Sequence, residues 1–200
     1  MHHIGESLCQ LFREPIYKCH ELINTSNDYS FGSCKTTEGF KMNTWHTNYL
    51  IEEDVLEFES RFESGNLAVA SVSRLNKKKY YLALQRDINS RKITTQWFYF
   101  RVKNRQNTGT YTFNIVNYVK PFSMFSLGMK PCLYSVKSQR GWERAGTNIE
   151  YRPNTISYDE DRHYYTLSFS YDFKHADDEV FIAYCYPYTY SRLQAFLDEL

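Results

Sequence analysis

The chain has 200 residues, which is room for one large domain or two small ones. Aromatic residues make up 18% of it, and this excludes a mainly disordered protein because disordered chains are poor in aromatic side chains. The formal net charge is +1, whereas strong binding to nucleic acid or an anionic membrane usually needs a basic excess, so neither is an expected partner.

Residues 1–51 are predicted to form an N-terminal arm, partly helical or irregular, that packs on a larger domain. The apolar positions of 16–23 have helical spacing, which predicts a short helix there. Residues 24–40 are rich in Asn, Ser, Thr and Gly, as loops are.

Residues 52–188 follow a different pattern, with short segments of period two that are rich in β-branched and aromatic residues. These segments are 80–84, 97–102, 111–117, 132–136, 164–171 and 180–185. Turn residues separate them at 87–90, 107–109, 141, 152–154 and 177–178. Regularly spaced short strands without intervening helices predict an all-β fold, an antiparallel β-sandwich.

Residues 189–200 change to a helical period. Leu193, Phe196, Leu197 and Leu200 would form one apolar helix face. Ser191 and Gln194 have the spacing of a capping box at the start of this helix. The segment has no C-terminal cap signal, so we expect the natural chain to continue beyond it into a linker.

Two groups of basic residues are candidates for contact with an acidic ligand. Arg101, Lys103 and Arg105 alternate, so on a strand they would share one face. Arg74 and the run 77–79 form a second cluster. For both groups the alternative is a solvated face or loop.

A run of alternating tyrosines follows the last predicted strand. The run consists of Tyr184, Tyr186, Tyr188 and Tyr190, and Pro187 interrupts it and limits the strand. Tyrosine suits interfaces that have one wet side, so the run is a candidate interdomain seam. The alternative is ordinary core packing with satisfied hydroxyl groups.

Catalytic and metal-binding residues are not expected in this chain. His3 and Glu6 match the H-x-x-E zinc pattern, but only two residues precede His3, too few for the strand that would aim both ligands. Cys19, His20, Cys34 and His46 fit no standard zinc-finger spacing. Five widely spaced cysteines indicate reduced thiols in a cytosolic protein.

Several segments together resemble the N-terminal domain of the cytosolic carboxypeptidases, a family of zinc metallocarboxypeptidases that act as tubulin deglutamylases. The segments occur in family order from Phe58 to Leu200. They are 58–67 (FESRFESGNL), 96–102 (QWFYFRV), 113–117 (FNIVN), 120–121 (KP), 128–131 (GMKP), 141–144 (GWER) and 184–191 (YCYPYTYS).

The resemblance implies an antiparallel β-sandwich that precedes a zinc carboxypeptidase domain. The catalytic H-x-x-E motif, its distant His, the substrate-binding Arg and the general-base Glu would all follow Leu200. The zinc would therefore lie in that domain, with no cofactor in this chain. The implied partners are the chain's own C-terminal catalytic domain and tubulin or another polyglutamylated protein, in a cytoplasmic, microtubule- or cilium-associated location.

Three functions follow from these observations. The first is a non-catalytic domain that supports folding of a deglutamylase and helps to dock acidic substrate tails. The second is a free-standing β-sandwich that binds proteins or peptides. The third is a small enzyme in its own right, for which the sequence offers only the unconvincing metal patterns above.

Overall fold

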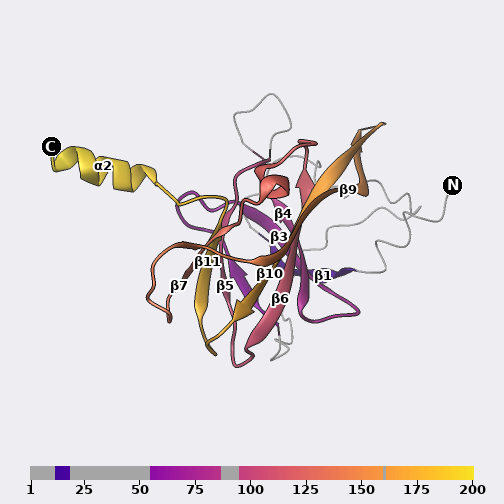
Figure 1. Cartoon of the computed structure of the whole chain (residues 1–200), viewed down its shortest axis with the longest axis horizontal. Coiled ribbons are helices and arrows are strands. Elements are labelled where there is room, and N and C mark those ends of the chain that lie inside the picture. The colour runs from indigo at the N-terminus through magenta and orange to yellow at the C-terminus, as the bar shows by residue number, and fades with distance from the viewer. Residues whose placement is uncertain (1–11, 19–54, 87–94, 160) are drawn as a thin grey trace.

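The computed structural model describes residues 12–18, 55–86, 95–159 and 161–200, the first of these segments by its backbone alone. Two β-sheets pack against each other in these residues, and a helix extends away from them at the C-terminal end (Figure 1). The all-β sandwich is therefore confirmed. Neither described helix is long and apolar enough to cross a membrane.

The first sheet has six strands in the order β1-β3-β4-β6-β10-β9. Their bounds are β1 (Phe12–Lys18), β3 (Leu67–Ser73), β4 (Lys79–Leu84), β6 (Gly109–Tyr118), β10 (Arg162–Phe173) and β9 (Thr147–Asp159). We call it the large sheet.

The second sheet, the small sheet, has five strands in the order β2-β5-β11-β7-β8. Their bounds are β2 (Glu57–Glu59), β5 (Tyr99–Lys103), β11 (Glu179–Ala183), β7 (Cys132–Ser135) and β8 (Glu143–Arg144). The helical elements are η2 (Met124–Leu127) and α2 (Tyr190–Asp198).

Large rings fill the space between the sheets. The fully buried aromatic side chains come from both sheets: Tyr80, Phe98, Phe100, Tyr111, Phe113, Phe169 and Phe173. Each aromatic side chain removes roughly 150–250 Å² from water on burial, so a few of them supply much of the stabilising apolar area. The high aromatic content of the sequence is thus explained by the core.

One strand pair departs from the predicted antiparallel arrangement. β4 and β6 run parallel, with Lys79 opposite Thr112 and Leu82 opposite Ile115. Parallel neighbours need a long crossover connection, and here the chain passes through β5 in the other sheet before it returns as β6.

All six predicted strand segments are strands in the structure, but the pattern missed others. β9 is the longest strand, although residues 152–154 predicted a turn. It is an edge strand with half-buried and exposed side chains, and an edge position tolerates Pro153 because its missing N–H is not needed by a neighbour on that side.

The helix predicted over 16–23 is wrong at its start. Residues 16–18 belong to β1, which pairs antiparallel with β3. Two register shifts flank Pro15, as expected for a proline in an edge strand. Residues 19–23, like most of the predicted arm, lie outside the described residues.

The strand registers place the turns at two opposite ends of the sandwich. Glu179 pairs with Lys103 and Ala183 pairs with Tyr99, so β11 runs from one end to the other. At the end where β11 finishes lie the loops 60–66 and 119–131 and the segment 184–189. We call this the exit end. The far end carries the turns 74–78, 104–108, 136–142 and 174–178.

Candidate functional site

The predicted basic row lies on the outer face of the small sheet. Arg101 and Lys103 point outward from β5, and Arg105 follows just after the strand. Each is paired with a carboxylate of this chain. Arg101 Nη1 lies 3.0 Å from Glu179 Oε2, Lys103 Nζ lies 3.3 Å from Asp177 Oδ1, and Arg105 Nη2 lies 2.7 Å from Glu57 Oε1.

These carboxylates were not identified from the sequence. Glu57 and Glu179 both stand opposite Lys103, because β2 and β11 flank β5 on either side. That neighbourhood depends on strand order, which period-two patterns do not reveal. The row is therefore largely neutralised within the chain, and its contact with an acidic substrate stays a prediction.

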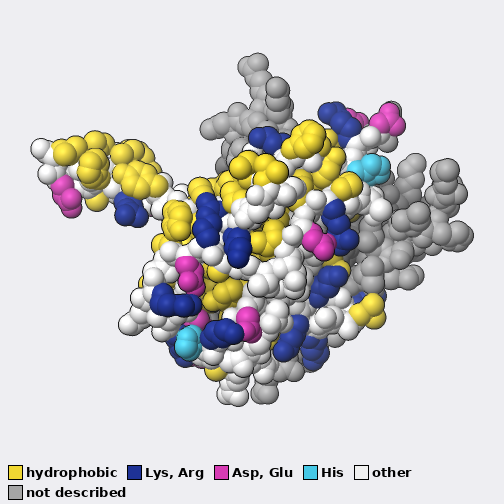
Figure 2. All heavy atoms as spheres, viewed as in Figure 1, with side chains coloured by type: hydrophobic (Ala, Val, Ile, Leu, Met, Phe, Trp, Pro, Cys, Tyr) yellow, Lys and Arg dark blue, Asp and Glu magenta, His cyan; other side chains and the backbone are white. Residues whose placement is uncertain are grey.

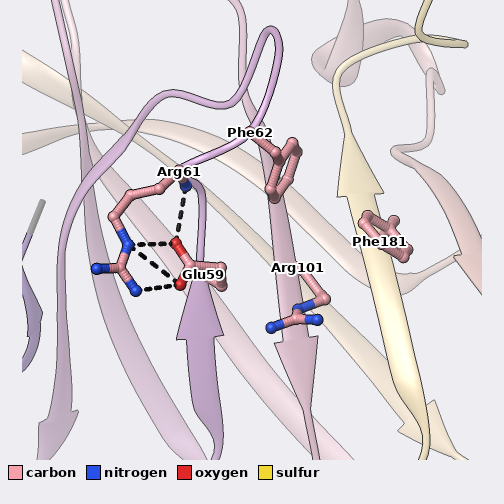
Figure 3. Close-up of a pocket in the computed structure, with 5 residues that line it drawn as sticks. All are labelled: Glu59, Arg61, Phe62, Arg101 and Phe181. Carbon is pink, nitrogen blue, oxygen red and sulfur yellow. Dashed lines mark hydrogen bonds and ion pairs between the residues drawn. The ribbon is translucent and has the colours of Figure 1, made fainter.

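A shallow depression of ≈ 620 Å³ opens on the same face (Figure 3). Its lining consists of Glu59, Arg61, Phe62, Arg101 and Phe181. Arg61 Nε donates to Glu59 Oε1 at 2.9 Å, and its Nη2 donates to Glu59 Oε2 at 2.5 Å. Hydrogen bonding by Arg61 lowers the pKa of Glu59 to about 2. A carboxylate held in this way is a poor general acid or base near neutral pH, so the depression has the chemistry of a contact surface.

Half-buried rings continue from this depression across the small sheet. The Phe62 and Tyr99 ring centroids are 4.9 Å apart, and Tyr99 lies 5.9 Å from Trp142. Tyr134 contacts both Trp142 and Phe181, at 5.7 and 6.2 Å. Burial raises the pKa of Tyr99. These rings therefore pack on one another across the outer face of the small sheet.

The tyrosine run divides between the core and the surface. Tyr184 is half-buried, with its ring 5.5 Å from that of Phe125 and 5.9 Å from that of Phe98. Tyr186, Tyr188 and Tyr190 are 53%, 58% and 69% exposed. Core packing thus accounts for the first tyrosine, and the rest present rings to the exterior of the sandwich.

Helix α2 (Tyr190–Asp198) falls within the predicted helical segment 189–200 but begins at a different cap. Its N-cap is Thr189, whose side chain accepts a hydrogen bond from Arg192 N, so the capping box at Ser191 is wrong. None of its residues is buried, although Leu193, Phe196 and Leu197 lie on one face. Figure 1 shows the helix projecting away from both sheets.

Further apolar side chains are exposed beside the exit segment. Phe122, Met124 and Leu127 are 88%, 55% and 78% exposed, whereas their neighbour Phe125 is buried against Tyr184. We call Phe122, Met124, Leu127, Tyr186, Tyr188 and the apolar face of α2 the exit surface. Figure 2 shows hydrophobic side chains gathered at the top of the sandwich and along the helix.

Two tyrosines lie beneath the exit surface. Burial raises the pKa of both Tyr118 and Tyr151 well above the usual range. The Tyr151 hydroxyl donates to the carbonyl oxygen of Lys120 at 2.5 Å. The Tyr118 hydroxyl has no hydrogen-bond partner in the described part of the protein.

Metal-binding groups do not assemble in the described ranges, where no three His, Cys, Asp or Glu side chains lie close enough to hold an ion. The two zinc patterns of the sequence, His3 with Glu6 and the set around Cys19, lie outside these ranges. Cys132 is a buried free thiol, and burial raises its pKa.

Comparison with known proteins identifies the family. The family model described as "Cytosolic carboxypeptidase N-terminal domain" matches residues 58–185. Cytosolic carboxypeptidase 3 of Mus musculus is 42% identical over 149 residues, which are 72% of this chain and 14% of the relative. Cytosolic carboxypeptidase 2 of Homo sapiens is 44% identical over 150 residues, 73% of this chain and 16% of the relative.

A solved metallo-carboxypeptidase from Pseudomonas aeruginosa, in complex with (2-guanidinoethylmercapto)succinic acid, is similar with 24% identity and a TM-score of 0.48. The similarity covers 72% of this chain and 33% of that one. The chain spans less than a fifth of the length of the two cytosolic carboxypeptidases named above. Because the family model covers well over half of its residues, the chain belongs to the cytosolic carboxypeptidase N-terminal domain family.

Proposed function

We propose that this chain is the non-catalytic N-terminal domain of a zinc carboxypeptidase that removes glutamates from polyglutamylated proteins such as tubulin. The zinc and the catalytic groups belong to a following domain. The enzyme would act in the cytoplasm, in association with microtubules or cilia. The domain supports the catalytic fold through the exit surface and positions the enzyme on acidic substrates.

The observation that carries this proposal is the exposed apolar face of α2. The helix has nine residues, and a helix of that length is marginal in water unless packing stabilises its apolar face. The same end of the sandwich exposes Phe122 and Leu127, and contiguous apolar surface of this kind usually marks an interface. The relatives of this chain are several times longer and supply a candidate for the covering domain.

Intact mass of the native polypeptide, captured from its own cells, is the first test. A mass well above 23.9 kDa, with new sequence after Leu200, supports the proposal. A mass equal to that of this chain contradicts the proposal and favours the alternative, a free-standing β-sandwich that binds proteins or peptides.

Substitution on α2 tests the interface directly. In the longer protein we expect Phe196→Asp to abolish zinc-dependent glutamate release, because a carboxylate would be buried against the catalytic domain. Gln194→Asp, on the opposite side of the same helix, is the matched control and should retain activity. Full activity of both variants would contradict an interface formed by α2.

The row Arg101, Lys103 and Arg105 gives a second, separate test. If it contacts acidic tails, the tails must exchange with the carboxylates that now pair with the row. Charge reversal of all three residues in the longer enzyme should then weaken binding to glutamylated tails. Unchanged affinity at low salt would contradict a contact between this row and acidic tails. It would not contradict the proposal that the domain supports the catalytic fold.

A further inference from the structure

The far end of the sandwich has a strong excess of positive charge. Its four turns carry seven Lys and Arg residues but only two Asp residues, although the whole chain has a net charge of +1. One of the two, Asp178, is 1% exposed and accepts hydrogen bonds from Ser135 and Lys137. Figure 2 shows Lys and Arg side chains gathered at the lower end of the sandwich.

Most of these cations already have partners. Arg105 pairs with Glu57, Arg140 with Glu143 and Lys174 with Asp172. Lys137 donates to the carbonyl oxygen of Ala176. Because these cations already have partners within the chain, they are less available to an external anion.

The turn between β3 and β4 differs from the other turns. We call Arg74, Lys77, Lys78 and Lys79 the basic hairpin. Among the described residues, no carboxylate lies within ion-pair distance of Arg74, Lys78 or Lys79. Lys78 and Lys79 instead place their ammonium groups 5.5 and 5.6 Å from the ring centroids of Tyr111 and Tyr81.

The backbone of the basic hairpin is held in place. Asn76 closes the turn, because its side-chain oxygen accepts from Lys78 N and its carbonyl oxygen accepts from Lys79 N. Lys78 O accepts from Thr112 N and so ties the turn to β6. Between the cations, Leu75 is 83% exposed. A fixed turn that carries cations loses little backbone entropy when an anion binds.

We propose that the basic hairpin binds an acidic segment of a polypeptide, with several carboxylates in a run and an apolar group that contacts Leu75. This inference deepens the proposed function, on which it rests, since it assigns the recruitment of an acidic substrate to the hairpin. An acidic polypeptide fits better than nucleic acid, because Lys79 lies over the Tyr81 ring and Tyr111 is buried, so neither ring offers an open face on which a base could stack. It also fits better than a lipid surface, which needs an apolar face, whereas the hairpin offers Leu75 alone.

Binding of a labelled oligoglutamate peptide to the 200-residue chain, measured by fluorescence anisotropy at low ionic strength, tests the inference. Oligoglutamine of equal length is the neutral probe and should not bind. In the triple variant Arg74→Gln, Lys78→Gln, Lys79→Gln we expect affinity to fall about tenfold, since three exposed ion contacts are lost and each contributes modestly. Thermal unfolding of the variant checks that it remains folded.

The matched control removes the same charge elsewhere. Lys130→Gln, Arg152→Gln, Arg192→Gln should change affinity by less than about twofold, because a local contact and not net charge decides binding. Equal weakening in both triple variants would overturn the inference. So would absence of peptide binding, or binding to phosphatidylserine vesicles in its place.

The peptide assay tests the hairpin site independently of the α2 variants, which test the proposed function. The peptide assay needs no catalytic domain, and the α2 variants do not alter the hairpin. Peptide binding together with full activity of Phe196→Asp would sustain the hairpin site and overturn the interface. The reverse pair of results would sustain the interface and overturn the hairpin site.

Discussion

Glu59 is a carboxylate whose ionisation is tied to the fold. Arg61 lowers its pKa from 4.5 to about 2, so its folded-state pKa lies below its unfolded value. The resulting stabilisation is present above pH 4.5 and is lost as the pH falls toward 2. We expect Glu59→Gln to lower the free energy of unfolding by about 1 kcal/mol at neutral pH, a value reduced for the exposure of Arg61.

The difference between Glu59→Gln and the parent should shrink as unfolding is measured at successively lower pH. Glu150→Gln is the control, because Glu150 is exposed and its oxygen lies 3.9 Å from Arg152. A deficit in Glu59→Gln that persists at the lowest pH would show that packing, and not charge, is responsible.

Tyr118 and Tyr151 lie close together but differ in the hydrogen bonding of their hydroxyl groups. The Tyr118 hydroxyl has no partner in the described segments, whereas that of Tyr151 donates to Lys120 O. Tyr118→Phe should leave the free energy of unfolding unchanged or raise it, and Tyr151→Phe should lower it by about 1 kcal/mol. Urea denaturation of both variants measures the two effects. A loss in Tyr118→Phe as large as that in Tyr151→Phe would mean that water satisfies the buried hydroxyl in solution.

At the scale of elements, most central strands were predictable and edge strands were not. The exception is β3, a central strand that shows no period of two because nearly all of its side chains are buried. β5 and β11 lie between two neighbours and largely alternate buried and half-buried side chains, so the period of two is visible in the sequence. β9 has one neighbour and no residue that is fully buried, and its proline suggested a turn.

The candidate site was predictable to a similar extent. The outward direction of Arg101 and Lys103 followed from strand periodicity. Their partners Glu179 and Asp177 come from a strand and a turn more than seventy residues away, and strand order alone brings them together. The exposure of α2 likewise depends on its direction relative to the sheets, which periodicity does not contain.

Asn104 joins two turns of the far end. Its side-chain nitrogen donates to the carbonyl oxygens of Asn107 and His175, and its oxygen accepts from Asp178 N at 2.7 Å. The side chain is fully buried, so Asn104→Ala would remove a hydrogen bond from each of three backbone groups. We expect a loss of about 2–4 kcal/mol in the free energy of unfolding. Gln106→Ala, at an exposed position of the same turn, should stay within about 0.5 kcal/mol of the parent.

The cap of α2 gives a second prediction for an element. Thr189→Ala should cost the helix about 1 kcal/mol and lower its population in NMR secondary shifts. The free energy of unfolding of the sandwich should not change, because α2 buries no residue. Ser191→Ala is the informative control, since the sequence places the cap there; loss of helix in this variant alone would contradict the cap at Thr189.

At the scale of the whole molecule, the two ends of the sandwich have opposite characters. The exit end exposes contiguous apolar side chains, and the far end exposes cations around a single leucine. One end is thus suited to a stable interface and the other to a weak, salt-dependent contact. This separation would let one domain hold the catalytic domain while its opposite end remains accessible.

The exit surface also determines how the separate chain should behave. Without a covering domain, we expect the 200-residue chain to self-associate with increasing concentration in sedimentation velocity. The double variant Phe122→Ser, Leu127→Ser should reduce this association, because both side chains are more than three-quarters exposed within the patch. Leu75→Ser removes an equally exposed leucine from the far end, where it has no apolar neighbours in the hairpin, and should leave association unchanged. Equal effects of the two changes would mean that association depends on scattered apolar residues and not on the exit surface.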